Sequence, residues 1–94
     1  MKIDISIVGR GGHGSRPDQS INPIDCFTAV FSGIFQLGGQ MLVEQVDGGN
    51  TTNVIPDCLR FRLNCREEDV PAVKKLTDGL CAGYQCTAEY QIIE

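Results

Sequence analysis

The segment from Gly9 to Pro17 limits the fold more than any other, because it separates a strand-like stretch from a helix-like one. It holds four of the eleven glycines and the only histidine of the chain, His13. Glycine weakens both helices and strands, and Pro17 disfavours helical backbone in the residue before it. The chain must therefore turn here. The bare backbone around His13 also lets a ligand approach the imidazole closely, which is typical of a ligand-facing loop.

The stretches around this segment predict the order β-α-β-β-α-β. Strands are indicated where apolar residues alternate with polar ones. The first helix is expected to begin where Asn22 can act as N-cap and Pro23 as first residue, and to end at Gly38. Three acidic residues mark the start of a second helix, which ends at Gly83. The predicted strands are Lys2–Val8, Met41–Val46, Cys58–Cys65 and Cys86–Ile93, and the predicted helices cover residues 23–37 and 67–82.

This order predicts an α+β, ferredoxin-like fold with a four-stranded antiparallel sheet and two helices on one face. The first and third strands are central in that layout, and Met41–Val46 lies at an exposed edge. Residues 51–57 are expected to form an irregular connection, because Pro56 cannot join a central ladder. The apolar face of the second helix is expected to consist of Val73, Leu76 and Leu80.

The first helix carries two apolar stripes rather than one. The first stripe has helical spacing and consists of Ile24, Phe27, Phe31, Ile34 and Phe35. The second consists of Cys26, Val30 and Leu37. One stripe is enough for the core of so small a domain, so the helix is expected to face something outside it as well. An exposed edge strand is a template for pairing with another strand, and together these features predict self-association.

Size and composition exclude several classes of protein. With 94 residues the chain has room for one domain with one core. A net charge of −4 argues against nucleic acid as a partner. No apolar run approaches the ~18 residues of a membrane span, so no membrane partner is expected. Five cysteines without a C-x-x-C pair favour reduced thiols and a cytoplasmic location.

Two other chemistries fit the residues poorly. Gly9, Gly11 and Gly14 spell the G-x-G-x-x-G dinucleotide fingerprint, but the helix signal comes too late, at Asn22, for its N-terminus to meet a pyrophosphate. A metal site is not expected, because a single histidine without H-x-D or paired carboxylates nearby supplies no ligand set. A Cys–His nucleophilic pair has five candidate thiols, but nothing in the sequence positions one of them.

Four spaced motifs together resemble a known family. They are the glycine segment with Asn22-Pro23-Ile24, then Gly48-Gly49, then Asn53-Val54-Ile55-Pro56, then Arg66. Over nearly all 94 residues the chain resembles the lid or dimerization domain of the aminoacylase/carboxypeptidase family of dinuclear zinc metallopeptidases. Its G-G-H-G-S-x-P form is similar to that of the N-acyl-amino-acid amidohydrolases, the hippurate-hydrolase-like members.

The resemblance implies that residues 1–94 are a non-catalytic part of a larger hydrolase. The family's catalytic domain holds two divalent metal ions, expected to be zinc, and the general-base glutamate. His13 matches the lid histidine that stabilises the oxyanion in the partner subunit's active site. Asn53 matches a substrate contact, and Arg66 matches the arginine that holds the substrate carboxylate; the resemblance implies that these carboxylate contacts, like His13, serve the partner subunit's active site. By itself the chain is expected to be inactive, and to dimerise through its first helix and the Met41–Val46 edge.

Plainer interpretations of these residues stay open at this point. His13 can be a turn residue without a task, Asn53 an Asx-turn residue, and Arg66 a surface cation beside Glu67 and Glu68. The residues before Arg66, Asn64 and Cys65, also depart from the family's commoner acidic or small ones. An alternative function is a free-standing ferredoxin-like domain that binds a small effector for regulation.

Overall fold

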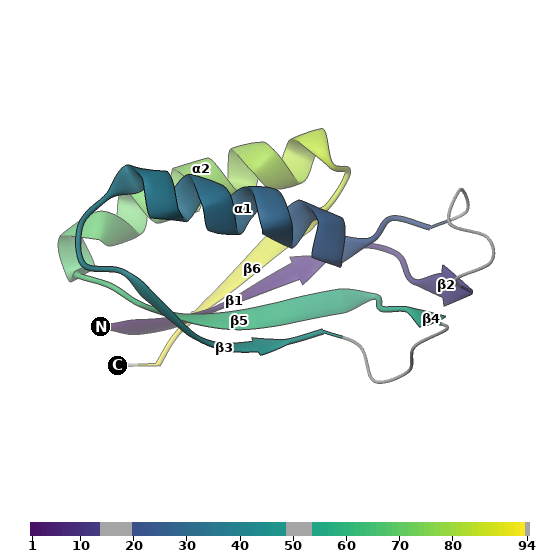
Figure 1. Ribbon diagram of the computed structural model, residues 1–94, viewed down its shortest axis with the longest axis horizontal. Coiled ribbons are helices and arrows are strands. Elements are labelled where there is room, and N and C mark those ends of the chain that lie inside the picture. Colours follow the sequence, from purple (N-terminus) through teal and green to yellow (C-terminus); the bar gives the residue numbers. More distant parts are fainter. Residues whose placement is uncertain (14–19, 49–53, 94) are drawn as a thin grey trace.

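Two helices cover one face of a four-stranded antiparallel sheet in the computed structural model, which describes residues 1–13, 20–48 and 54–93 (Figure 1). The strand order is β3-β5-β1-β6, so the first and third predicted strands are central, as expected. The predicted α+β, ferredoxin-like layout is confirmed. The elements are β1 (Lys2–Val8), β2 (Gly12–His13), α1 (Pro23–Leu37), β3 (Leu42–Asp47), β4 (Val54–Ile55), β5 (Cys58–Asn64), a 3-10 turn η2 (Glu67–Asp69), α2 (Val70–Gly83) and β6 (Thr87–Ile92).

The core lies between the helices and the inner face of the two central strands. Antiparallel pairing sets Ile5 of β1 opposite Phe61 of β5, so alternate side chains of both strands point to the same face. All of them are buried, as expected for strands in which apolar residues alternate with polar ones. The buried side chains of the two strands are Ile3, Ile5, Ile7, Leu59, Phe61 and Leu63.

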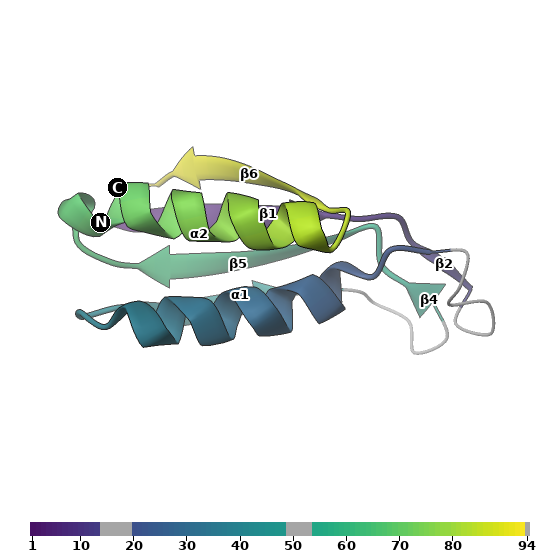
Figure 2. The same cartoon turned by 90° about the horizontal axis from the view of Figure 1, so that it is seen from above.

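The first helix begins and ends where the sequence indicates. The side chain of Asn22 accepts a hydrogen bond from the backbone N–H of Ile24 at 3.0 Å, and Pro23 is the first helical residue. Gly38 ends the helix with φ of 77°, a left-handed conformation that glycine adopts without strain. Seen from above, α1 runs along the β3 side of the sheet and α2 along the β6 side (Figure 2).

The residues that each helix buries against the sheet are not its largest apolar residues. In α1 the buried line combines Cys26 and Val30 of the second stripe with Ile34 of the first. Phe31 and Phe35 of the first stripe and Leu37 of the second are exposed. In α2 the buried line is Val73, Thr77 and Cys81; Leu76 and Leu80 are only partly buried.

The contact between the two helices accounts for this choice of buried residues. A Cβ added to Gly33 of α1 would lie 2.9 Å from a methyl group of Leu76. Leu76 therefore fills the groove between the helices, beside a residue without a side chain. The smaller side chains of the two buried lines then face the sheet, so that both helices can approach it closely.

One short strand pairing was not predicted from the sequence. β2 and β4 form a two-stranded antiparallel sheet in which His13 lies opposite Val54 and Gly12 opposite Ile55. The expectation of an irregular connection over residues 51–57 is thus wrong for 54–55. Two-residue strands carry no measurable periodicity, and their partners lie far apart in the chain. The edge strand also differs slightly, since β3 has a bulge between Val43 and Gln45.

The two ends of the described chain lie side by side at one end of the sheet (Figure 1). The backbone N–H of Ile93 donates to the carbonyl of Lys2 at 2.8 Å, and that of Cys65 donates to the carbonyl of Met1 at 2.9 Å. The β2–β4 pair lies at the opposite end. Among the described helices, none has the length and apolar character that crossing a membrane requires.

Candidate functional site

The glycine segment is held between two other parts of the backbone. Arg10 exchanges two backbone hydrogen bonds with Ile21, both 2.8 Å long. The N–H of Gly9 donates to the carbonyl of Asp57 at 2.8 Å, and that of Gly11 donates to the Asp57 carboxylate at 2.7 Å. A Cβ at Gly9 would meet the carbonyl oxygen of Ile21 at 2.3 Å, so only glycine permits this approach. The glycines therefore fix the path of the chain into β2.

This anchoring brings two of the sequence motifs together. Antiparallel pairing sets the backbone of His13 directly opposite Val54, in the N-V-I-P motif. Asn53, the predicted substrate contact, directly precedes Val54 in the sequence but lies outside the described residues. The side chain of His13 and residues 14–17 of the glycine segment are likewise not described. The structure thus places the backbone of Gly12 and His13 beside that of Val54 and Ile55 in the N-V-I-P motif.

Arg66 lies at the other end of the sheet, directly after β5, and it is not free. Its Nε donates to Oδ2 of Asp69 at 3.0 Å and its Nη2 to Oδ1 of the same carboxylate at 3.4 Å. Oε2 of Glu68 is 3.8 Å from Nη1. Hydrogen bonding to Asp69, with the charge of that group, raises the pKa of Arg66 above its usual value. The arginine is therefore held in place by the 3-10 turn η2, which directly precedes α2.

His13 and Arg66 of one chain are far apart. β5 alone, with seven residues, spans roughly 20 Å at about 3.4 Å per residue. Arg66 follows the end of β5 that pairs with Lys2, whereas His13 lies beyond the end that pairs with Val8. A single N-acyl amino acid is much shorter than this strand. One copy of the domain therefore cannot bring both side chains to the same small substrate.

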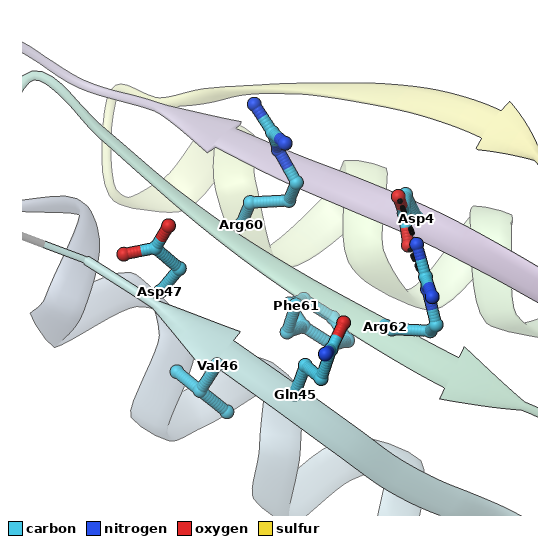
Figure 3. Close-up of a pocket in the computed structure, with 7 residues that line it drawn as sticks. All are labelled: Asp4, Gln45, Val46, Asp47, Arg60, Phe61 and Arg62. Carbon is cyan, nitrogen blue, oxygen red and sulfur yellow. Dashed lines mark hydrogen bonds and ion pairs between the residues drawn. The ribbon is translucent and has the colours of Figure 1, made fainter.

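The open face of the sheet, away from the helices, is polar (Figure 3). Arg62 of β5 donates to Asp4 of β1 through Nε at 2.7 Å and Nη2 at 3.1 Å. This bond to Arg62 is the main reason that the pKa of Asp4 lies below its usual value. Arg60, Asp47 and the Asp4–Arg62 pair line a cavity of about 330 Å³. The pair ties the two central strands together on their outer side.

Three thiols gather in the core between the helices and the start of β6. The Sγ atoms of Cys26 and Cys81 are 3.6 Å apart, and Cys86 is also buried. Burial raises the pKa of Cys26 to about 12 and that of Cys86 to about 11. These thiols are therefore poor nucleophiles. Cys58 is exposed, in contrast to the other four cysteines, and all five are free.

An exposed apolar surface covers one side of the molecule. Phe35 is 79% exposed, and Phe31 on the same helix and Val46 on β3 are also exposed. Val46 pairs with the buried Phe61, and Phe27 joins Phe61 to Phe31 through ring contacts at 5.1 and 5.9 Å, so one set of packed side chains underlies the exposed residues of α1 and β3. We call Phe31, Phe35 and Val46 the apolar edge. Exposed aromatic side chains in such a group are typical of a protein–protein contact.

The described residues contain no group of three or more His, Cys, Asp or Glu side chains that could hold a metal ion. What they do offer is an apolar edge, a histidine segment at one end of the sheet and a clamped arginine at the other.

Comparison with known families decides what kind of domain this is. The family profile described as the peptidase dimerisation domain matches residues 1–81. The chain belongs to this family. The family resemblance inferred from the motifs is thereby confirmed, and the alternative of a free-standing effector-binding domain finds no support.

The segments that this chain matches in its relatives are parts of longer hydrolases. N-acetylcysteine deacetylase of Bacillus subtilis is 26% identical over 106 residues, which cover 96% of this chain and 28% of that protein. Succinyl-diaminopimelate desuccinylase of Ehrlichia ruminantium is 31% identical, over 92% of this chain and 26% of that protein. The chain thus spans about a quarter of the length of these relatives.

A solved structure shares the fold. It is a dinuclear metal-binding peptidase of the M20 family from Bacillus subtilis, with a TM-score of 0.69 and 24% identity over 96% of this chain and 24% of that one. At this identity the likeness supports the fold alone. The sequence therefore predicted both the family and the architecture, while the roles of His13, Asn53 and Arg66 stay predictions.

Proposed function

We propose that this domain dimerises a metal-dependent amidohydrolase or peptidase and supplies side chains to its active sites. The substrates are N-acyl amino acids or small peptides, and two divalent metal ions, zinc in our proposal, belong to a catalytic domain outside this chain. Hydrolysis of acyl amino compounds by the deacetylase and desuccinylase relatives supports this substrate class. Free thiols fit a cytoplasmic protein.

The apolar edge is the proposed contact between two copies. Phe31, Phe35 and Val46 are exposed on α1 and β3, the two elements expected to dimerise. A two-fold axis beside β3 would set the same apolar side chains of both copies against each other. The β3 bulge between Val43 and Gln45 limits regular pairing to the parts of the strand on either side of it.

The length of the domain supports the proposal that His13 acts in trans. The segment matched in the deacetylase relative is 28% of that protein, and we propose that the catalytic domain adjoins the end of the sheet where Lys2 and Cys65 lie. His13 lies at the opposite end of a domain that is 41 Å long. A histidine so far from its own attachment point is suited to the active site of the partner subunit.

Arg66 has the opposite placement. It follows Cys65, which is hydrogen-bonded to Met1, so it lies next to the attachment point. We infer that Arg66 binds the substrate carboxylate in the active site of its own subunit, while His13 serves that of the partner. Each complete site would then contain a histidine from one chain and an arginine from the other.

The chemistry of both groups suits these roles. Imidazole can donate a hydrogen bond to the oxyanion of a tetrahedral intermediate, and a guanidinium matches a carboxylate through two parallel bonds. The metal ions, when bound, supply a hydroxide nucleophile and polarise the scissile carbonyl. The lid residues orient the substrate and stabilise the charge that develops on it.

Mixing two single variants of the full-length enzyme tests this arrangement. His13→Ala removes an oxyanion donor and should lower kcat about 10²–10³-fold. Arg66→Ala should lower kcat/KM about tenfold to a hundredfold for substrates with a free carboxylate. If the two residues come from different chains, a hybrid dimer keeps one complete site. After random exchange about half of the dimers are hybrid, so about a quarter of the wild-type activity should return.

The alternatives give different results. If both residues act in the same site from the same chain, every site of the hybrid lacks one of them, and the mixture stays as inactive as its components. The same two proteins assayed without subunit exchange are the control. A His13→Ala enzyme with unchanged kcat would contradict the role of the histidine altogether.

A further inference from the structure

The carboxylate of Asp69 is directed at Arg66 rather than at the helix that it begins. Asp69 precedes α2, in a position where an aspartate commonly caps the free backbone N–H groups of a helix. Its side chain makes no capping hydrogen bond. Both oxygens instead accept from Arg66, at 3.0 and 3.4 Å. The Asp69 side chain is 17% exposed and that of Arg66 is 51% exposed, so the pair has a sheltered side and an open side.

This pairing leaves one edge of the guanidinium available. A guanidinium has five N–H donors arranged in a plane. The Asp69 carboxylate accepts one hydrogen bond from Nε–H and one from Nη2–H. The parallel pair of N–H donors on Nη1 and Nη2 therefore remains available to a second carboxylate. The only other carboxylate described near this edge is Glu68, whose Oε2 is 3.8 Å from Nη1 and whose side chain is 74% exposed. Glu68 is too far for a hydrogen bond and can move away into solvent.

The turn between α1 and β3 keeps this region open. Gly39 has φ of 80°, and a Cβ there would lie 3.3 Å from Nη2 of Arg66. The turn therefore approaches the guanidinium with bare backbone. Between this turn and the end of β5 lies a cleft of about 540 Å³, lined by Met1 and by residues 39–42 and 64–66. The cleft gives a small ligand room beside Arg66.

We propose that Asp69 is a positioning residue, which holds the guanidinium of Arg66 so that its second edge receives the carboxylate of the substrate in this cleft. The proposal rests on the proposed function, in which Arg66 binds that carboxylate. It extends that function by naming the group that orients the arginine and the turn that borders the ligand. The occupant is the α-carboxylate of an N-acyl amino acid.

Electrostatics alone predicts the opposite effect for Asp69. A negative charge near the cleft repels an anionic substrate, so neutralising either Asp69 or Glu68 would strengthen binding if charge were all that mattered. If Asp69 orients Arg66, its neutralisation weakens binding instead, because the arginine loses its fixed geometry. Glu68 is therefore a matched control, since it is the adjacent residue and carries the same charge.

The test compares Asp69→Asn, Glu68→Gln and Arg66→Ala in the metal-loaded full-length enzyme. The probes are N-acetyl-L-methionine and N-benzoylglycine, each with its primary amide as alternative substrate or competitive inhibitor. Asp69→Asn should raise KM about threefold to tenfold for the carboxylates, with kcat little changed and the amides unaffected. Glu68→Gln should leave KM unchanged or lower it. Asp69→Glu should restore part of the loss.

The outcomes separate this inference from the proposed function. If Arg66→Ala weakens carboxylates selectively but Asp69→Asn behaves like Glu68→Gln, the positioning role is refuted and the arginine's role stands. Equal weakening of carboxylates and amides by Asp69→Asn would show a general structural defect and also refute it. If Arg66→Ala does not distinguish the two probe classes, or neither carboxylate is hydrolysed, the proposed function fails and this inference with it.

Discussion

Replacing Phe35 with serine should dissociate the proposed dimer without unfolding the domain. Phe35 is 79% exposed, so its side chain contributes little to the core of its own chain. Full burial of a phenylalanine side chain stabilises by about 1.5–3 kcal/mol. Covering the exposed part of Phe35 is therefore worth about 1–2.5 kcal/mol for each copy. Each copy of a two-fold interface contributes its own Phe35, so Phe35→Ser should weaken dimerisation by about 2–5 kcal/mol, or about thirtyfold to four-thousandfold in Kd.

Sedimentation velocity over a dilution series of the full-length protein measures this change. Ile92→Ser is the matched control, because Ile92 is also apolar and 55% exposed but lies on β6, at the other edge of the sheet. The control should keep the wild-type Kd, and Phe35→Ser should keep the wild-type circular dichroism spectrum. The reasoning is refuted if Phe35→Ser dimerises like wild type, or if Ile92→Ser dissociates the dimer equally.

Two further predictions concern the domain itself. Asp4→Asn should lower Tm by about 4–8 °C at pH 7 through loss of the Arg62 pair. Since the folded pKa of Asp4 lies below its unfolded value of about 3.9, the pair stabilises above that pH and its contribution is lost as the pH falls through the lower, folded pKa. The Tm values of wild type and Asp4→Asn should therefore converge as the pH is lowered from 7 to 2. A difference in Tm that stays constant over this range would contradict the reasoning. With a thiol reagent, Cys58 should react rapidly in the native domain and the four buried cysteines only on unfolding; rapid reaction of Cys26 or Cys86 would contradict their burial.

Local pattern was enough to predict most of the fold. Alternation in β1 and β5 identifies both the strands and their buried face, because a strand that is half buried repeats every two residues. The Asn22 cap and Gly38 determine where α1 begins and ends, because helix capping depends on hydrogen bonds and backbone conformation of neighbouring residues. The spaced motifs also identified the family, which the match over residues 1–81 confirms.

Tertiary structure alone decided which face of each helix is buried. Both stripes of α1 are apolar, so periodicity could not choose between Val30 and Phe31. In the structure Leu76 of α2 packs beside Gly33 of α1, at the contact between the helices, and Val73, Thr77 and Cys81 are the buried residues of α2. The same packing leaves Phe35 in solvent, and it thereby creates the surface that the proposed dimer uses.

The arrangement of the candidate site was likewise not readable from the sequence. His13 and Val54 are strand partners although about forty residues separate them, and their pairing exists only once the sheet has formed. Spacing in the sequence also gave no sign that Arg66 lies at the far end of β5 from His13, bound to Asp69. Local periodicity reports which side of an element is apolar, whereas distances between elements follow from how the strands pair and which chain ends they bring together.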